Sequence, residues 1–229
     1  MKNKSFDLKK IVGIAIFSAL AFVVAIVCNV IPPIQGFLSL DVKDAVIAIA
    51  SFIYGPVAAI LISFIAAFIE FATFSTTGWY GFVMNFASSA VFSLTASLIY
   101  NRFRSINGAL VAFFSAIIAT TGVMLLLNNY VTPIYLFDYL KVMPEVAARA
   151  YVKSLLPGVL LPFNATKALL NSSVAMLLYK PLTVALTRAK IIQGKSAKLT
   201  FNKYSVLILV VGVVALAASI VSFVIINNH

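Results

Sequence analysis

Residues 45–74 read AVIAIASFIYGPVAAILISFIAAFIEFATF, an apolar stretch that contains a single charged residue. A helix needs about 20 apolar residues to cross the hydrocarbon core of a bilayer. The stretch is too long for one such helix, and Pro56 disfavours helical backbone at Gly55 before it. We therefore predict two helices, a short one over Asp44–Tyr54 and a full span over Val57–Phe74.

The composition of the chain extends this interpretation to the whole protein. Of its 229 residues, 62% are hydrophobic and 10% are charged, and the mean hydropathy is +1.08. Soluble domains carry about a quarter charged residues, so an ordinary globular protein is excluded. We predict an all-α integral membrane protein. Its other spans are predicted at Lys10–Ile31, Trp79–Tyr100, Gly108–Leu136, Leu155–Leu186 and Ser205–Ile226.

The spans group into three parts. We predict a six-helix membrane domain over residues 1–186, a basic cytoplasmic linker over 187–204, and an additional membrane helix with a short outer tail over 205–229. Cytoplasmic loops carry an excess of lysine and arginine. With the N-terminus inside, most of the 17 basic residues fall on the cytoplasmic side of the cell membrane, and the C-terminus lies outside. The basic residues expected outside are Lys43, Lys141, Arg149 and Lys153.

Catalytic chemistry has little support in this sequence. One cysteine, Cys28, and one histidine, His229, cannot supply an internal disulfide, a cluster of metal-binding imidazoles or a histidine-based triad. Paired acids or a nucleophile with its base, which mark many enzymes, are not visible. We predict a protein without enzymatic activity, metal or cofactor. A membrane enzyme of unknown chemistry is the remote alternative.

The most informative side chain is Lys167, which lies inside an apolar segment in the stretch LPFNATK, residues 161–167. A lysine at mid-helix costs about 2.5–3.5 kcal/mol on insertion scales, and such residues usually face a cavity or a partner. Asn164 precedes it by three residues, so both side chains share one helix face. We predict that both bind a ligand. The alternatives are that Lys167 snorkels toward the outer membrane interface, or that it makes a hydrogen bond that only stabilises packing.

Three further polar residues are candidates for the same site. Asn129 lies in a polar patch near the outer end of its predicted helix, and this patch could equally be an interfacial cap. Asn85 could bind the ligand or join two helices by a hydrogen bond. Glu70 could contact a ligand, pair with Lys167 or lie at the interface, and the sequence does not choose among these.

The loop between the first two predicted helices reads PPIQGFLSLDVKD over residues 32–44 and is unusually apolar for a solvated segment. Covering a ligand cavity is one explanation, with Leu40 and Asp41 as candidate contacts. Lying on the membrane surface is the other. Asp44 is expected to cap the helix that follows.

Five segments carry a resemblance to a known family: FLSLDVKD (37–44), YGPVA (54–58), GWYGFVMNF (78–86), NY (129–130) and LPFNATK (161–167). Together they are similar to the riboflavin-specific S components, the substrate-binding subunits of energy-coupling factor (ECF) vitamin transporters. The resemblance covers about residues 8–188. It implies a six-helix protein whose pocket opens outward beneath the loop 32–44, with riboflavin as transported ligand.

The resemblance also implies partners, namely a transmembrane coupling subunit and two cytoplasmic ATPase subunits. Nucleic acid is not an expected partner, because the basic residues flank apolar segments and so indicate orientation in a bilayer. Ala15 and Ala19 match the family's docking motif, and their spacing of four residues allows another helix to approach closely. The alternative is an S component for another vitamin, such as pantothenate or folate. These ligands are anionic, so their pocket should hold more basic groups than Lys167.

Overall fold

The computed structural model describes residues 8–103 and 106–188, together with five isolated positions near the C-terminus. The predicted linker 187–204 and the predicted helix Ser205–Ile226 lie almost entirely outside the described residues. The described part is helical. Its elements are α1 (Leu8–Cys28), α2 (Lys43–Tyr54), α3 (Pro56–Thr73), α4 (Gly78–Arg102), α5 (Ile106–Ile134), α6 (Glu145–Leu155) and α7 (Leu161–Arg188), with π-helical turns η1 (Tyr135–Tyr139) and η2 (Leu156–Leu160).

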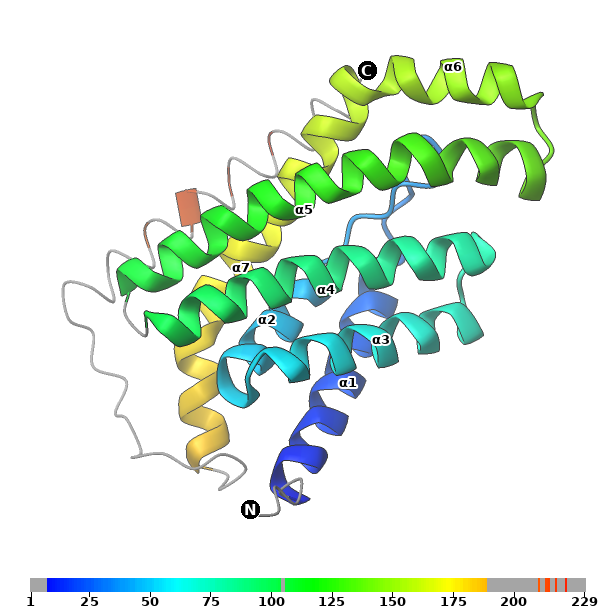
Figure 1. Cartoon of the computed structure of the whole chain (residues 1–229). Helices are drawn as coiled ribbons and strands as arrows, with labels where there is room; N and C mark the ends of the chain where they lie inside the picture. Colours follow the sequence, from blue (N-terminus) through cyan, green and yellow to red (C-terminus); the bar gives the residue numbers. More distant parts are fainter. Residues whose placement is uncertain are drawn as a thin grey trace, which may run out of the picture.

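The short helix α2 lies at the centre of the bundle, among α1, α3, α4 and α7 (Figure 1). All of its residues from Lys43 to Phe52 are buried. A helix that is apolar on every side must be covered on every side. Because neighbouring helices rather than lipid surround it, α2 needs only 12 residues, as its sequence predicts.

The longer helices form the membrane-crossing part. Within the part of the chain that the structure describes, five helical segments are long and apolar enough to span a bilayer, and α2 is not among them. Helices α3, α4 and α5 pack in chain order, and α6 packs against α5 (Figure 1). The candidate spans are Leu8–Cys28, Pro56–Thr73, Gly78–Arg102, Asn107–Tyr139 and Glu145–Tyr179.

The helix predicted over Leu155–Leu186 begins earlier than predicted, because α6, η2 and α7 follow one another without a break. The sequence predicts Arg149 and Lys153, which belong to α6, outside the membrane between two helices. Hydropathy misses α6 because it is amphipathic: Ala148 and Val152 are buried, whereas Glu145 and Arg149 are exposed and form an ion pair of 2.7 Å one turn apart.

The predicted break between the second and third helices is confirmed at Gly55. Its φ of 93° and ψ of 174° belong to a backbone region that is essentially reserved for glycine. Pro56 then opens α3, where its missing N–H is not needed. This turn reverses the chain, so that α3 returns alongside α2.

We expect Gly55→Ala to lower the free energy of unfolding by about 1–3 kcal/mol, the cost of a side chain in that backbone region. The cost is purely conformational, since a Cβ atom on Gly55 would meet no other atom within 4 Å. Thermal unfolding in detergent measures it. Gly122→Ala in α5 is the matched control, because that site is equally open but has no positive φ. Equal midpoints for the two variants would contradict the turn geometry.

Candidate functional site

A cavity opens between residues 29–42, which we call the α1–α2 loop, and the adjacent ends of α4, α5 and α7. It holds about 680 Å³ of empty space, including the part open to solvent. Rings and hydrogen-bonding groups share its lining, which includes Phe37, Ser39, Tyr80, Asn85, Asn128, Tyr135, Phe163, Asn164 and Lys167.

Lys167 lies in the wall of this cavity and is 8% exposed. Its Nζ donates to Asp41 Oδ2 at 2.7 Å and to the carbonyl oxygen of Ser39 at 3.2 Å. An ammonium has three N–H donors. With two of them directed to the α1–α2 loop, one donor remains for a molecule in the cavity. The snorkelling alternative is wrong, because the side chain points into the protein.

Asn164 lines the cavity beside Lys167, as their spacing predicts. Its Nδ2 donates to the carbonyl oxygen of Leu160 at 2.8 Å, one turn back along the chain. This bond uses one of the two amide hydrogens. The other hydrogen and the Oδ1 atom stay available, so Asn164 can donate and accept at once.

Asp41 fastens the α1–α2 loop to α7. Its carboxylate meets Lys167, and its backbone carbonyl accepts a hydrogen bond from Asn171 Nδ2 at 2.9 Å. Asn171 Oδ1 in turn accepts from the backbone N–H of Ala45 at 2.8 Å. Burial alone would raise the pKa of Asp41, but the Lys167 and Lys43 ammonium groups outweigh it and hold that pKa at about 2. The carboxylate is therefore charged at neutral pH.

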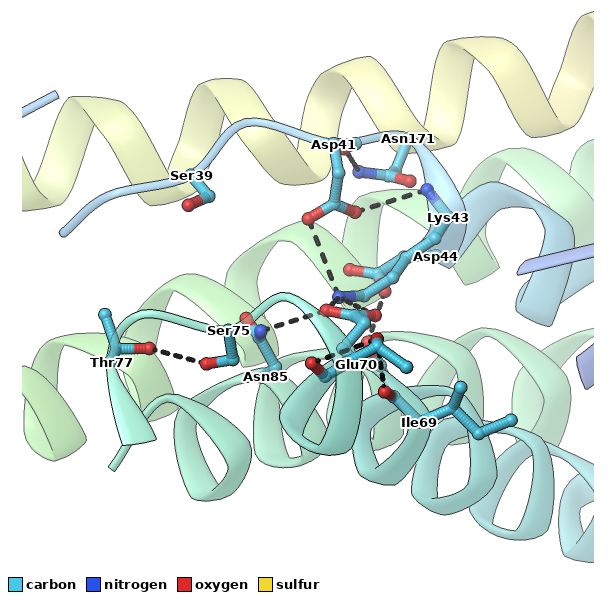
Figure 2. A network of polar contacts seen from close by, with 12 residues as sticks. Ser39, Asp41, Lys43, Asp44, Ile69, Glu70, Ser75, Thr77, Asn85 and Asn171 are labelled. Atoms are coloured by element: carbon cyan, nitrogen blue, oxygen red, sulfur yellow. Dashed lines mark hydrogen bonds and ion pairs between the residues drawn. The ribbon is translucent and has the colours of Figure 1, made fainter. Parts of the chain in front are cut away.

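A second buried ion pair joins Lys43 to Glu70, as Figure 2 shows. Lys43 Nζ contacts both carboxylate oxygens of Glu70, at 2.7 and 2.8 Å, and lies 3.7 Å from Asp41 Oδ2. Glu70 Oε2 also accepts a hydrogen bond from Asn85 Nδ2 at 3.1 Å. Glu70 thus pairs with Lys43, not with Lys167.

The predicted site residues do not all meet in one place. Asn85, Asn164 and Lys167 line the cavity together. Leu40 and Asp41 line a second, smaller cavity on the other side of the α1–α2 loop. Asn129 lines neither, because its neighbour Asn128 carries the inward position. Met124, Asn128, Val131 and Tyr135 share one helix face, but their spacing alone does not show that this face of α5 meets the cavity.

At two polar residues, Asp44 and Lys43, the structure differs from what the sequence predicts. Asp44 was expected to cap α2, but the N-cap residue is Val42 and Asp44 lies in the first turn, where it accepts a short hydrogen bond from Ser89 Oγ. Lys43 was placed in an outer loop, yet it is 1% exposed. In the sequence, a buried lysine at the end of an apolar helix looks the same as a solvated one. Only the contact with the distant residue Glu70 shows that Lys43 is buried.

Aromatic rings frame one side of the cavity. Tyr135 of η1 packs against Phe37 and Tyr80, with ring centroids 6.5 and 5.8 Å apart. Tyr80 Oη donates to Asp138 Oδ2 at 2.9 Å, which fixes that ring. Rings on one side and amide and ammonium groups on the other suit a flat aromatic ligand with a polar edge.

Comparison with known proteins identifies the family. The model of the ECF transporter substrate-specific component matches residues 9–179, which is most of the chain. The chain belongs to this family. As an ECF substrate-specific component it is a multi-pass membrane protein, in agreement with its helices.

Similar proteins are found among curated transporters and solved structures. The riboflavin transporter RibU of Staphylococcus aureus (strain TCH60) is 31% identical over 79% of this chain and 93% of its own length. The riboflavin transporter FmnP of Bacillus subtilis (strain 168) is 27% identical over 75% of this chain and 90% of its own length. A solved S component of a bacterial ECF transporter aligns with a TM-score of 0.63 and 30% identity, covering 79% of this chain and 98% of that one.

We expect Lys167→Met to destabilise the ligand-free S component, since Asp41 then keeps only Lys43, at 3.7 Å. Removing one partner of a buried ion pair typically costs about 3–5 kcal/mol. The double variant Asp41→Asn/Lys167→Met removes both charges and should recover much of the loss. Thermal unfolding in detergent compares them, with Lys153→Met, an exposed lysine of α6, as control. A double variant no more stable than Lys167→Met would contradict this pairing.

Proposed function

We propose that this chain is the riboflavin-binding subunit of an ATP-driven ECF importer. It captures riboflavin from outside the cell and delivers it through a transmembrane coupling subunit and two cytoplasmic ATPase subunits. Two curated relatives of similar length are riboflavin transporters. The proposal keeps riboflavin as the transported ligand and assigns no catalytic step to this chain.

The main support for the proposal is that Lys167 and Asn164 both line one cavity, together with aromatic rings. Riboflavin has a flat tricyclic ring system, a pyrimidine edge with carbonyl oxygens beside a ring N–H, and a polyhydroxylated chain. The free N–H of Lys167 can donate to a carbonyl oxygen, and Asn164 can donate and accept along the same edge. Phe37, Tyr135 and Phe163 offer apolar surface to the rings.

Charge favours riboflavin over pantothenate or folate, the alternative vitamins. Lys167 is the only basic residue among the described residues that line the cavity. Asp41 already neutralises its charge at 2.7 Å. A ligand carboxylate would therefore find no uncompensated cation there, whereas an uncharged ligand with carbonyl groups needs only the remaining N–H donor. In this proposal, Leu40 and Asp41 hold the α1–α2 loop over the ligand. Asn129 has a supporting role next to Asn128 and does not itself line the cavity.

Orientation follows from the basic residues and the helix order. With a cytoplasmic N-terminus, the α1–α2 loop and the start of α4 lie outside, so the cavity opens outward. Ala15 and Ala19 both lie on the exposed face of α1, opposite the buried Ile14 and Phe17. We assign this exposed face to the coupling subunit.

We expect Lys167→Met and Asn164→Leu each to weaken riboflavin binding about tenfold to a few hundredfold. A hydrogen bond to a charged group is worth about 1.5–3 kcal/mol, an unpaired ligand carbonyl adds a desolvation penalty, and 1.4 kcal/mol is about tenfold. Quenching of flavin fluorescence measures the affinity. The double variant Asp41→Asn/Lys167→Met, in which neither partner of the buried ion pair is charged, is measured beside them to recognise a loss of binding that comes from a folding defect. Lys153→Met is the control.

Two outcomes would count against the proposal. If both site variants bind riboflavin within twofold of the parent, the ligand does not use this cavity. If the purified parent carries no flavin absorbance and does not respond to added riboflavin, the substrate is another molecule, and pantothenate and folate are the next ligands to titrate.

We expect Ala15→Trp/Ala19→Trp to abolish riboflavin uptake by cells while leaving riboflavin binding unchanged. Bulky side chains prevent close helix approach at the exposed face of α1 but do not reach the cavity, which α1 does not line. Uptake of labelled riboflavin and fluorescence titration report the two properties separately. Ala147→Trp/Ala150→Trp, on the exposed face of α6, is the matched control. Loss of binding in the α1 variant would show that these alanines act within the domain.

A further inference from the structure

Asn85 borders both of the cavities described above. The cavity that Lys167 and Asn164 line is here called the main cavity. Asn85 lines this main cavity and also the smaller cavity, which Glu70 and Asp41 line. Its Nδ2 donates to Glu70 Oε2 at 3.1 Å (Figure 2), and Glu70 lines the smaller cavity. Glu70 does not line the main cavity. The amide therefore has one end held by Glu70 and the other end turned to the main cavity.

The hydrogen bond to Glu70 determines which end of the Asn85 amide carries the NH₂ group and which end carries the oxygen. A carboxylate only accepts hydrogen bonds, whereas an amide has a donating NH₂ group and an accepting oxygen. A flipped amide would place Oδ1 against the carboxylate and repel it. The NH₂ group of Asn85 must therefore face Glu70, and its carbonyl oxygen must face away from it. The usual ambiguity between amide nitrogen and oxygen is removed here by the partner.

Glu70 is itself held in place. It is 4% exposed, and the buried Lys43 contacts both of its carboxylate oxygens. Lys43 also lies near Asp41, whose nearest cation is Lys167. A buried ion pair is weak support for stability, because desolvation offsets the attraction between the charges. The pair between Lys43 and Glu70 therefore calls for another explanation.

We propose that Glu70 is a positioning residue that acts through Asn85 and sets the hydrogen-bond pattern of the main cavity. It fixes the carbonyl oxygen of Asn85 as an acceptor, which selects a ligand with a hydroxyl or a ring N–H at that point. A ligand carboxylate or carbonyl at the same point is rejected, since two acceptors would meet. This inference rests on the proposed function, because riboflavin offers both kinds of donor.

A double-mutant cycle on riboflavin affinity tests the inference. We expect Glu70→Gln to weaken binding about threefold to tenfold, because its amide also allows the flipped orientation of Asn85 and one neutral hydrogen bond is at stake. In the Asn85→Leu background the same change should have an effect below twofold. Equal effects in both backgrounds would mean that Glu70 acts by general stability, and they would overturn the inference.

The neutral pair variant Lys43→Met/Glu70→Gln protects the test against a folding defect. It removes both buried charges together, which is usually far less harmful than removing one. We expect it to lose affinity as Glu70→Gln does, again only when Asn85 is present. Parental affinity in this variant would overturn the inference. Glu145→Gln, an exposed carboxylate paired with Arg149, is the control that should leave binding unchanged.

A ligand-free measurement separates this inference from the proposed function. The side-chain amide signal of Asn85 in an ¹⁵N-asparagine-labelled sample is assigned by its loss in Asn85→Leu. We expect Glu70→Gln to shift this signal and to speed exchange of its hydrogens, and Glu145→Gln to leave it unchanged. An unmoved signal overturns the role of Glu70 whether or not riboflavin binds. A shifted signal in a protein that ignores riboflavin upholds the positioning and rejects the proposed substrate.

Discussion

The carboxylate of Asp41 and the ammonium of Lys167 lie 2.7 Å apart, shielded from solvent. Each would be costly at this depth without the other, because an isolated charge loses its hydration and gains nothing in return. Their charges are compensated only when the α1–α2 loop lies against α7. The cavity exists because of this contact, since one of its walls is the loop and another is the helix.

Much of the fold could be predicted from hydropathy and from two residue types. Apolar runs located the long helices, and Gly55 with Pro56 marked the turn between α2 and α3. These signals are local, so a single sequence contains them. Helix α6 escaped because its stability comes from Ala148 and Val152 packing on a neighbour while its other side stays polar. Amphipathic segments at a membrane surface look like loops on a hydropathy scale.

The candidate site was predictable where a residue is anomalous by itself. Lys167 stands out in an apolar helix, and Asn164 follows from helical spacing. Lys43 did not stand out, and Glu70 could not be given a partner, because each lies close to a helix end where charge is ordinary. Their role becomes visible only in the contact between them, which joins residues 27 positions apart in the chain. The choice of Asn128 over Asn129 depends on the rotation of α5, which neighbouring helices set and composition does not.

Asn171 joins the start of α2 to the middle of α7, since its amide accepts from the N–H of Ala45 and donates to the carbonyl of Asp41. The first turn of α2 therefore donates a hydrogen bond to a side chain that the ribosome adds 126 residues later. Until α7 has entered the membrane, the N-terminal end of α2 lacks both this acceptor and the cation that balances Asp41. Completion of the central helix is thus tied to the arrival of the last described helix. Chains that stop before α7 would be left with an open, charged end in the bundle, because both the amide and the ammonium that meet this end come from α7.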